Sequence, residues 1–196
     1  MKIEHWALNI FMKDLNWKLL SSEYLFNDLW FSVRKDTCET PEGKIVSPYY
    51  VYGFPTWVTA VALTEDNKII MVRQYRHALG LTMMEIPGGC VDDTDDNLET
   101  AIQRELLEET GYSFSSIDYL GKTSANPSTN NNWMHMYLAR GGVKVKDQEL
   151  DHGEEIEVYL HSIEEVKQML KENKIIQSMH TTCLFYALNK LGQLNY

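Results

Sequence analysis

The chain has 196 residues and a net charge of −10, because 28 Asp and Glu outnumber 18 Lys and Arg. Hydrophobic residues make up 44% of the sequence and charged residues 23%, a balance typical of globular domains, so a disordered or fibrous chain is excluded. The negative surface repels a phosphate backbone, which argues against the binding of nucleic acid.

The three cysteines lie far apart, at positions 38, 90 and 183, and form no C-x-x-C pair. They indicate neither a disulfide framework nor a zinc site, and they favour the cytoplasm. Charged residues interrupt the first twenty positions, so we expect neither a signal peptide nor a membrane segment. We find no internal repeat or linker, and we expect a β-rich segment over residues 1–54 and a main domain over residues 55–196.

The N-terminal segment contains two strand-like stretches, Leu29–Arg34 and Ile45–Tyr52. Between them, Pro41-Glu42-Gly43 suits a hairpin turn, because proline presets φ and glycine is permissive. The pattern predicts a small antiparallel sheet of its own. Because a short hairpin is marginal alone, we expect this sheet to join two copies of the chain into a homodimer.

The main domain opens with two further strand-like runs, Thr56–Leu63 and Lys68–Tyr75, and a third follows at Trp133–Arg140. Ser162, with a glutamate three residues later, indicates the start of a short helix, and apolar spacing over residues 179–191 indicates another. Strands mixed with a few helices predict an α/β (α+β) sandwich rather than a helical bundle.

A longer helix is predicted between Asp96 and Thr110, where the hydrophobic period changes from two to about 3.6. Asp96 and Glu99 have the spacing of a capping box at its start. Gly111 is placed to end the helix in the left-handed conformation.

Three glutamates, Glu105, Glu108 and Glu109, share one face of this helix, within about 5–6 Å of one another. Such like charges destabilise a helix unless solvent screens them or a cation binds among them, and Mg²⁺ prefers oxygen ligands. A solvated acidic face and a metal site are therefore the two interpretations. Arg104 can hold a carboxylate through a bidentate pair, and the predicted turn at Pro87-Gly88-Gly89 can bring bare backbone close.

The segment Arg104–Tyr112 resembles the second half of the Nudix hydrolase signature, Arg-Glu-(aliphatic)-x-Glu-Glu-x-Gly-(apolar), at each fixed position. The first half departs from the signature, because the acid that follows Gly89 is Asp95 or Asp96, where the family usually has glutamate. The loop is also one residue longer.

This resemblance implies a Nudix-type α/β/α sandwich with a mixed sheet, plus the small N-terminal antiparallel sheet. It also implies a bound Mg²⁺, with Mn²⁺ as an alternative, and roles for Arg104 and Glu108 in catalysis. The metal ligands that it implies are the backbone carbonyl of Gly88 and the carboxylates of Glu105, Glu108 and Glu109.

The flanking segments Arg73–Arg76 and Glu85–Gly89 resemble the ADP-ribose pyrophosphatase branch of this family. The likeness implies that Arg76 faces the substrate phosphates and that Glu85 and Gly89 belong to the substrate site. The alternative is an ordinary exposed strand whose arginines pair with nearby acids.

The loop Asp151–Glu155 resembles the one from which similar enzymes supply a further acid, as a metal ligand or as the base that activates water. A mobile loop can bring such a base within hydrogen-bond reach once substrate is bound. Glu154 is the first candidate, with Glu155 and His152 behind it, and a solvated acidic loop is the alternative.

A nucleobase is best held by stacking on a flat ring. In the ADP-ribose enzymes the N-terminal sheet supplies such rings, and Trp30, in the first predicted strand, is the matching residue here. Tyr49 and Tyr50 are less securely aligned. Core or dimer contacts are the alternative for all three.

The resemblance implies hydrolysis of the pyrophosphate bond of a nucleoside diphosphate sugar, with ADP-ribose yielding AMP and ribose 5-phosphate as the favoured case. Another nucleotide sugar, such as a GDP-sugar, is one alternative. A nucleotide-sensing domain without turnover is a second, and an interaction protein with a merely solvated helix is a third.

Overall fold

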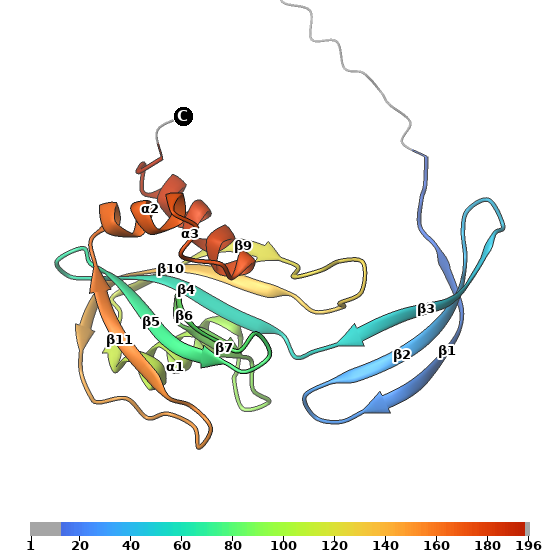
Figure 1. Ribbon diagram of the computed structural model, residues 1–196, viewed down its shortest axis with the longest axis horizontal. Helices are drawn as coiled ribbons and strands as arrows, with labels where there is room; N and C mark the ends of the chain where they lie inside the picture. Colours follow the sequence, from blue (N-terminus) through green and yellow to red (C-terminus); the bar gives the residue numbers. More distant parts are fainter. Residues whose placement is uncertain (1–12, 195–196) are drawn as a thin grey trace, which may run out of the picture. The chain divides into compact units, whose positions relative to one another are not determined.

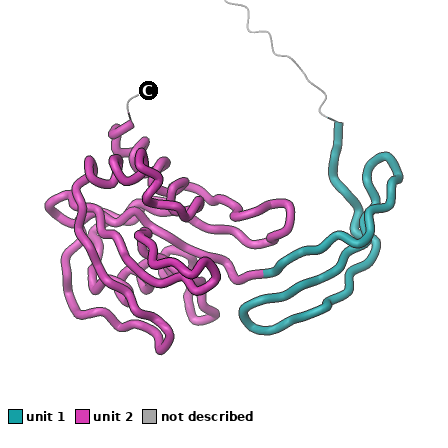
Figure 2. Tube along the Cα trace, viewed as in Figure 1, with its two compact units in different colours: residues 1–53 teal, residues 54–196 magenta. Residues whose placement is uncertain are grey.

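The computed structural model describes residues 13–194, which form two compact units, one up to Gly53 and one from Phe54 onward (Figure 2). Each unit contains one hydrogen-bonded sheet. No helix within the described residues is long and apolar enough to cross a membrane.

From residue 13 to residue 53, the N-terminal unit forms an antiparallel sheet of three strands in the order β1-β2-β3 (Figure 1). The strands are β1 (Lys18–Asn27), β2 (Ser32–Glu39) and β3 (Ile45–Gly53). The sequence predicted two of them. It missed β1 because every residue of that strand is exposed, so the strand shows no alternation of apolar and polar positions.

The prediction of a strand that starts at Leu29 and contains Trp30 is wrong. Trp30 lies in the turn between β1 and β2, where the side chain of Asp28 accepts hydrogen bonds from the N–H groups of Trp30 and Phe31, at 2.9 and 2.8 Å. An aspartate that bonds to the backbone two and three residues ahead stabilises a turn. This local bonding outweighs the β propensity of the aromatic pair.

The second unit contains a mixed sheet whose main path is β11-β5-β4-β10-β8, with β6 paired to β5, β7 to β4 and β9 to β10. Its central pair, β4 with β10, is parallel, and the other pairs are antiparallel. The strands are β4 (Trp57–Thr64), β5 (Ile69–Arg76), β6 (Leu81–Glu85), β7 (Gly88–Cys90), β8 (Tyr112–Ser113), β9 (Ser116–Thr123), β10 (Met134–Lys144) and β11 (Ile156–His161).

Within residues 13–194, three helices cover this sheet, α1 (Leu98–Thr110) on one face and α2 (Ile163–Lys171) with α3 (Ser178–Lys190) on the other (Figure 1). The predicted α/β/α sandwich with a mixed sheet is therefore confirmed. Because both faces of β4 are covered, seven of its eight residues are buried.

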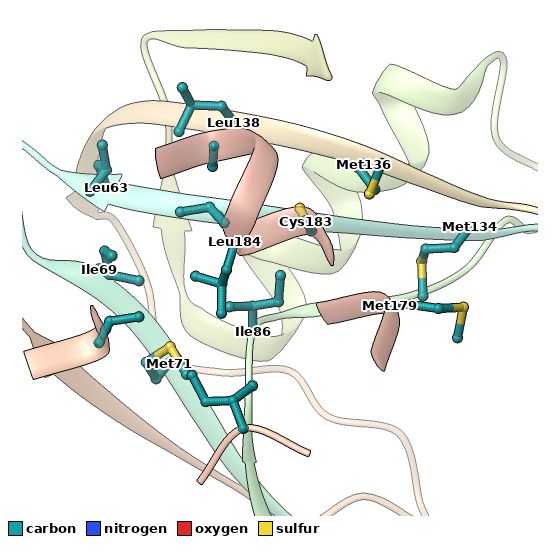
Figure 3. Close-up of a cluster of buried hydrophobic side chains, with 14 residues drawn as sticks. Leu63, Ile69, Met71, Ile86, Met134, Met136, Leu138, Met179, Cys183 and Leu184 are labelled. Atoms are coloured by element: carbon teal, nitrogen blue, oxygen red, sulfur yellow. The ribbon is translucent and has the colours of Figure 1, made fainter. Parts of the chain in front are cut away.

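A buried cluster lies on each face of the sheet. Val61 and Leu63 of β4 belong to the cluster beneath α2 and α3, whereas the alternating Ala60 and Ala62 belong to the cluster beneath α1. Figure 3 shows the first cluster, in which Leu184 of α3 lies among side chains from the strands. The small alanines on the other face leave room for α1 to lie close to the strands that carry the site.

Helix α1 begins one residue later than predicted. Its N-cap is Asn97, whose side-chain oxygen accepts from the N–H groups of Glu99 and Thr100 at 2.9 and 3.0 Å, so the predicted capping box from Asp96 is wrong. The predicted end is confirmed, because Gly111 has φ 76° and its N–H donates to the carbonyl of Leu107.

Two further local predictions have different outcomes. The capping box of Ser162 and Glu165 at the start of α2 is confirmed in both directions. The predicted turn at Pro87-Gly88-Gly89 is instead a bend at Pro87, after which the two glycines enter strand β7 and pair with β4. This pairing could not be predicted from the local sequence, because the partner strand β4 lies about thirty residues earlier in the chain.

Candidate active site

Arg104 of α1 binds acceptors from several segments. Its Nε and Nη2 donate to the two carboxylate oxygens of Asp95, at 3.1 and 2.9 Å. Nη2 also donates to the carbonyl of Cys90 at 2.9 Å, and Nη1 donates to Glu105 and Glu108 at 3.0 and 2.9 Å. The hydrogen bonds from Arg104 lower the pKa of Asp95, whose side chain is 3% exposed. Of the two aspartates that the sequence left open, Asp95 is the partner of the arginine.

Strand β7 approaches α1 closely because two of its residues lack a side chain. A Cβ on Gly89 would lie 2.7 Å from the carboxylate of Glu105. A Cβ on Gly88, which has φ +148°, would lie 2.2 Å from the carbonyl oxygen of Val58. The N–H of Gly88 donates to the carboxylate of Glu109 at 2.9 Å. The glycine pair thus places backbone groups directly against two of the glutamates.

Glu105 and Glu109 are desolvated carboxylates. Burial raises the pKa of Glu109 to about 8, and the charges of Glu105 and Glu154 act in the same direction. Burial raises the pKa of Glu105 to about 7, against the opposing effect of Arg104 and with the support of Glu108 and Glu154. Both carboxylates would therefore be stabilised in their charged form by an added cation.

No three Asp, Glu, His or Cys side chains within residues 13–194 converge closely enough to hold a metal ion as they stand. Glu105 and Glu108 turn to Nη1 of Arg104, while Glu109 turns to the N–H of Gly88. The donor set nevertheless fits Mg²⁺ or Mn²⁺ in kind, because it consists of carboxylate oxygens on one helical face and two of the groups are desolvated.

Arg76, at the end of β5, is held by a buried acid. Its Nε donates to a carboxylate oxygen of Glu85 at 2.9 Å, and its Nη2 forms an ion pair with the same oxygen at 2.8 Å; the Glu85 side chain is 1% exposed. The Arg76 side chain is 43% exposed, and its charge lowers the pKa of Glu109 against the larger effect of burial. Arg76 therefore pairs with an acid, as the alternative interpretation held, and its charge still acts on the carboxylate of Glu109 in α1. Arg73 pairs with Glu157 at 2.8 Å.

The acidic loop between β10 and β11 contains a compact turn. The N–H of Glu154 donates to the carbonyl of Asp151 at 2.9 Å, and the N–H of Asp151 donates to the carboxylate of Glu154 at 3.2 Å. The charge of Glu154 is near enough to act on the pKa of two glutamates of α1, in which burial is the larger cause. Glu155 and His152 are exposed in the same loop.

The aromatic candidates belong to the N-terminal unit. Trp30 is 62% exposed and Tyr50 is 45% exposed, whereas the ring of Tyr49 makes an edge contact with Trp17 at 5.8 Å between centroids. The exposed rings of Trp30 and Tyr50 are available for stacking.

Two residues that the sequence analysis did not single out contact the site. The side-chain amide of Gln148 donates to the carbonyl of Glu109 at 2.6 Å, across 39 positions. His180 lies with Nδ1 4.0 Å from Glu85 Oε1, and burial lowers its pKa to about 3, so the ring is neutral. Neither residue belongs to a sequence motif, and only the fold brings them here.

Several characterised proteins are similar to this chain. "Methanol dehydrogenase activator" of Bacillus methanolicus is 31% identical over 170 residues, covering 86% of this chain and 91% of that protein. "ADP-ribose pyrophosphatase" of Bacillus subtilis is 29% identical, covering 89% and 94%, and the protein of that name from Mycobacterium tuberculosis is 30% identical, covering 86% and 81%.

A solved structure, "Crystal structure of ADP compounds hydrolase", has a TM-score of 0.77 at 20% identity, covering 93% of this chain and 100% of that one, and it supports the fold. The model of the "Nucleoside diphosphate sugar hydrolase N-terminal domain" matches residues 17–52, the three-stranded sheet. The "NUDIX domain" model matches residues 54–180, the part that holds α1, its glutamates and the acidic loop. With its fold, its helix and this match in agreement, the chain belongs to the Nudix hydrolase family.

Proposed function

We propose that this chain hydrolyses the pyrophosphate bond of a nucleoside diphosphate sugar with the help of Mg²⁺, and that ADP-ribose is its substrate. Mn²⁺ is the alternative ion. The observation that carries the proposal is the set of glutamates on α1, two of them desolvated, against the glycine pair of β7, with the half-exposed side chain of Arg76 near enough for its charge to act on Glu109. Two of the relatives described above are named ADP-ribose pyrophosphatase, which supports this choice of substrate.

The ligands that we propose for Mg²⁺ are the carboxylates of Glu105, Glu108 and Glu109 and the backbone carbonyl of Gly88. When bound, the ion neutralises charge on the diphosphate and favours attack by water. This local positive charge is needed because the chain as a whole carries −10.

Two arginines have distinct parts in the proposal. Arg104 is almost fully engaged by carboxylates and a carbonyl, so its role is to hold Asp95, Glu105 and Glu108 in place. The side chain of Arg76 is 43% exposed and its direction is fixed by Glu85, so its proposed role is to bind the phosphates and stabilise charge on the leaving group.

Glu154 is the proposed general base, with Glu155 as the alternative. The carboxylate of Glu154 takes a proton from water, and the water oxygen bonds to one phosphorus. The bond from that phosphorus to the bridging oxygen then breaks. The other phosphate leaves with the bridging oxygen. With ADP-ribose the products are AMP and ribose 5-phosphate. Gly89 lets β7 lie close to Glu105, and Trp30 is proposed to stack on the nucleobase.

We propose a homodimer formed through the N-terminal sheet, because its outer strand β1 exposes a row of large apolar side chains and has an edge that no other described strand pairs with. Light scattering at micromolar concentration tests this proposal, and a monomer contradicts it. The free cysteines at positions 38, 90 and 183 fit the reducing cytoplasm as the proposed location.

The test of the activity is a panel of ADP-ribose, GDP-mannose, UDP-glucose, NADH and dinucleoside polyphosphates with Mg²⁺, and with EDTA as control. We expect the fastest release of products from ADP-ribose and none in EDTA. If GDP-mannose were hydrolysed fastest, the proposed substrate would be a GDP-sugar in place of ADP-ribose. Tight nucleotide binding without turnover would make the chain a sensor, and a chain that neither binds nor turns over any compound would contradict the proposal altogether.

A further inference from the structure

We propose that Gln148 is a positioning residue that fastens the acidic loop, residues 151–155, to the helix that carries the glutamates. The inference rests on the proposed function in one respect, since the loop is there assigned to supply the base Glu154. Gln148 touches neither the reacting atoms nor a proposed ligand carboxylate. It acts through two backbone carbonyls, that of Glu109 in α1 and that of Ile156 directly after the loop.

One amide nitrogen makes both connections. Nε2 of the half-buried Gln148 donates to the carbonyl of Glu109 in α1 at 2.6 Å and to the carbonyl of Ile156, the first residue of β11, at 3.0 Å. An amide NH₂ group has two donors, and here they meet two different segments. The end of the helix and the end of the loop are thus joined by a single side chain.

The helix needs these donors. The last carbonyls of an α-helix have no partner within the helix and must find one elsewhere. In α1 the carbonyl of Glu109 is met by Gln148, and that of Glu108 is met at 2.9 Å by the N–H of Glu149. Further on, the carbonyl of Gly111 accepts from the N–H of Val145 at 2.9 Å. The segment from residue 145 to 149 therefore satisfies the end of α1.

The loop is anchored at both ends and bonded to itself between them. Ile156 is paired with Gln74 of β5, so the end of the loop belongs to the sheet. Within the loop, Asp151 and Glu154 exchange hydrogen bonds and form one turn. Because the turn is bonded to itself, its position depends on the segments to which its ends are attached. Gln148 connects two of these segments, the start of β11 and the end of α1.

The electrostatic effect of Glu154 on the glutamates of α1 agrees with this geometry. Glu154 acts on Glu105 and Glu109 although its backbone lies some forty-five residues further along the chain. We call the two hydrogen bonds from Gln148 the clamp. Without the clamp, the loop would keep only the backbone contacts at its two ends, and the carboxylate of Glu154 would sample a wider volume. A displacement of about 1 Å at a reacting group can reduce a rate by as much as about 100-fold.

The first experiment measures the loop directly, by amide hydrogen exchange of the metal-free protein. We expect Gln148→Met to raise exchange over residues 149–156 by about tenfold, while the amides in the middle of α1 keep their protection. Gln168→Met, which removes an exposed amide on α2 that donates to Glu172, is the matched control and should leave the loop unchanged. Unchanged exchange in the loop of Gln148→Met would overturn the proposal.

Gln148→Asn keeps the amide on a shorter stem, so that it can reach only one of the two carbonyls. We expect it to change loop exchange in the same direction and by less than Gln148→Met. This variant also serves where the methionine variant fails to fold, and normal exchange in a folded asparagine variant would count against the clamp.

The second experiment is a double-mutant cycle on turnover. We expect Gln148→Met to lower kcat by about 10-fold to 100-fold with KM changed less than about twofold, because the substrate contacts remain. In a Glu154→Gln background the same change should lower kcat by less than about twofold, since there is no base left to position. Equal losses in both backgrounds would show a general structural effect and overturn the positioning role.

The two proposals fail separately. A wild-type chain that hydrolyses none of the nucleotides contradicts the proposed function, while exchange still decides whether Gln148 fastens the loop. A Glu154→Gln variant with full activity removes the base role of Glu154, and with it the catalytic part of this inference, which assigns the base to that residue.

Discussion

The two units of the chain bury their apolar side chains to very different extents. In the second unit both faces of the sheet carry a packed cluster, with Leu106 of α1 and Leu184 of α3 fully buried. Among the described residues up to Gly53, Val51 is the one apolar side chain that is buried, and all of β1 is exposed.

This difference implies that the second unit provides most of the folding stability, whereas the N-terminal sheet is suited to association with another molecule. Burial of apolar surface is the main favourable term in folding, so the second unit is where most of the stability of the chain is expected. It also carries the glutamates of the candidate site on a helix that packs against a buried cluster, which suits a site whose carboxylates must be held in place. The N-terminal sheet has a backbone ladder but little core, and its exposed strand is suited to contact with another surface.

The largest effect on stability is expected in the core of the second unit. Leu184→Ala should lower the free energy of unfolding by about 2–5 kcal/mol, through lost burial and the cavity left behind. Urea unfolding followed by circular dichroism measures this. A loss below about 1 kcal/mol would show that the cluster is loosely packed and would weaken the contrast between the units.

The largest effect on activity is expected at Glu109. Glu109→Gln should lower turnover at least about 100-fold, or about 2.7 kcal/mol, while the amide oxygen can still accept from Gly88 and the fold is kept. Steady-state kinetics with ADP-ribose and Mg²⁺ measure the loss. The matched control is Glu99→Gln, an exposed acid in the first turn of the same helix, which should retain its rate. Full activity of the Glu109 variant would remove the metal role of this residue.

The pH dependence of stability in EDTA should sharpen the account of the buried carboxylates. Burial raises the pKa of Glu109 to about 8 in the folded chain, whereas an unfolded glutamate titrates near 4.5. Between these values the unfolded state binds fewer protons, so stability is full below the lower value and is lost as pH rises through the upper one. We therefore expect thermal stability to fall from pH 7 to pH 8.5.

Two comparisons isolate the cause of that fall. Burial lowers the pKa of His180 to about 3, so this residue reduces the stability of the chain only when pH falls below its unfolded pKa near 6.5. It therefore does not contribute to the fall between pH 7 and pH 8.5. Glu109→Gln should flatten the slope, leaving the smaller share of Glu105, and Mg²⁺ should restore wild-type stability at pH 8.5. A slope that is the same in the variant would place the titration elsewhere.

A smaller effect tests where α1 begins. Asn97→Ala removes the side chain that caps two backbone N–H groups and should lower stability by about 0.5–2 kcal/mol. Asp96→Ala is the control and should change stability by less than about 0.5 kcal/mol. Chemical denaturation compares the two, and the reverse order would restore the cap predicted from the sequence.

The smallest intrinsic effect is expected in β1. Leu25 is 51% exposed within its unit, so Leu25→Ala should change the unfolding free energy of the monomer by no more than about 0.5 kcal/mol. Sedimentation at several concentrations should instead show weaker self-association. A large loss of stability at concentrations where the chain is monomeric would contradict the contrast between the two units.

Much of the fold and of the site follows from the sequence, because the relevant interactions are local. The period of the apolar residues in α1, the left-handed glycine at its end and the cap at Ser162 each depend on residues at most a few positions apart. The spacing that places Arg104 beside the glutamates is equally local, and the structure keeps them together.

Other features were decided only when distant segments met. Asp95 became the partner of Arg104, and Asn97 the cap, although neighbouring residues of similar chemistry were available in the same short loop. Strand β1 showed no pattern, because neither of its faces is buried in the unit. The clamp by Gln148 and the approach of Glu154 depend on contacts across tens of residues. Local sequence determines which backbone conformations and charges are present, whereas tertiary packing selects among equivalent donors and acceptors by placing one of them at the closest hydrogen-bonding distance.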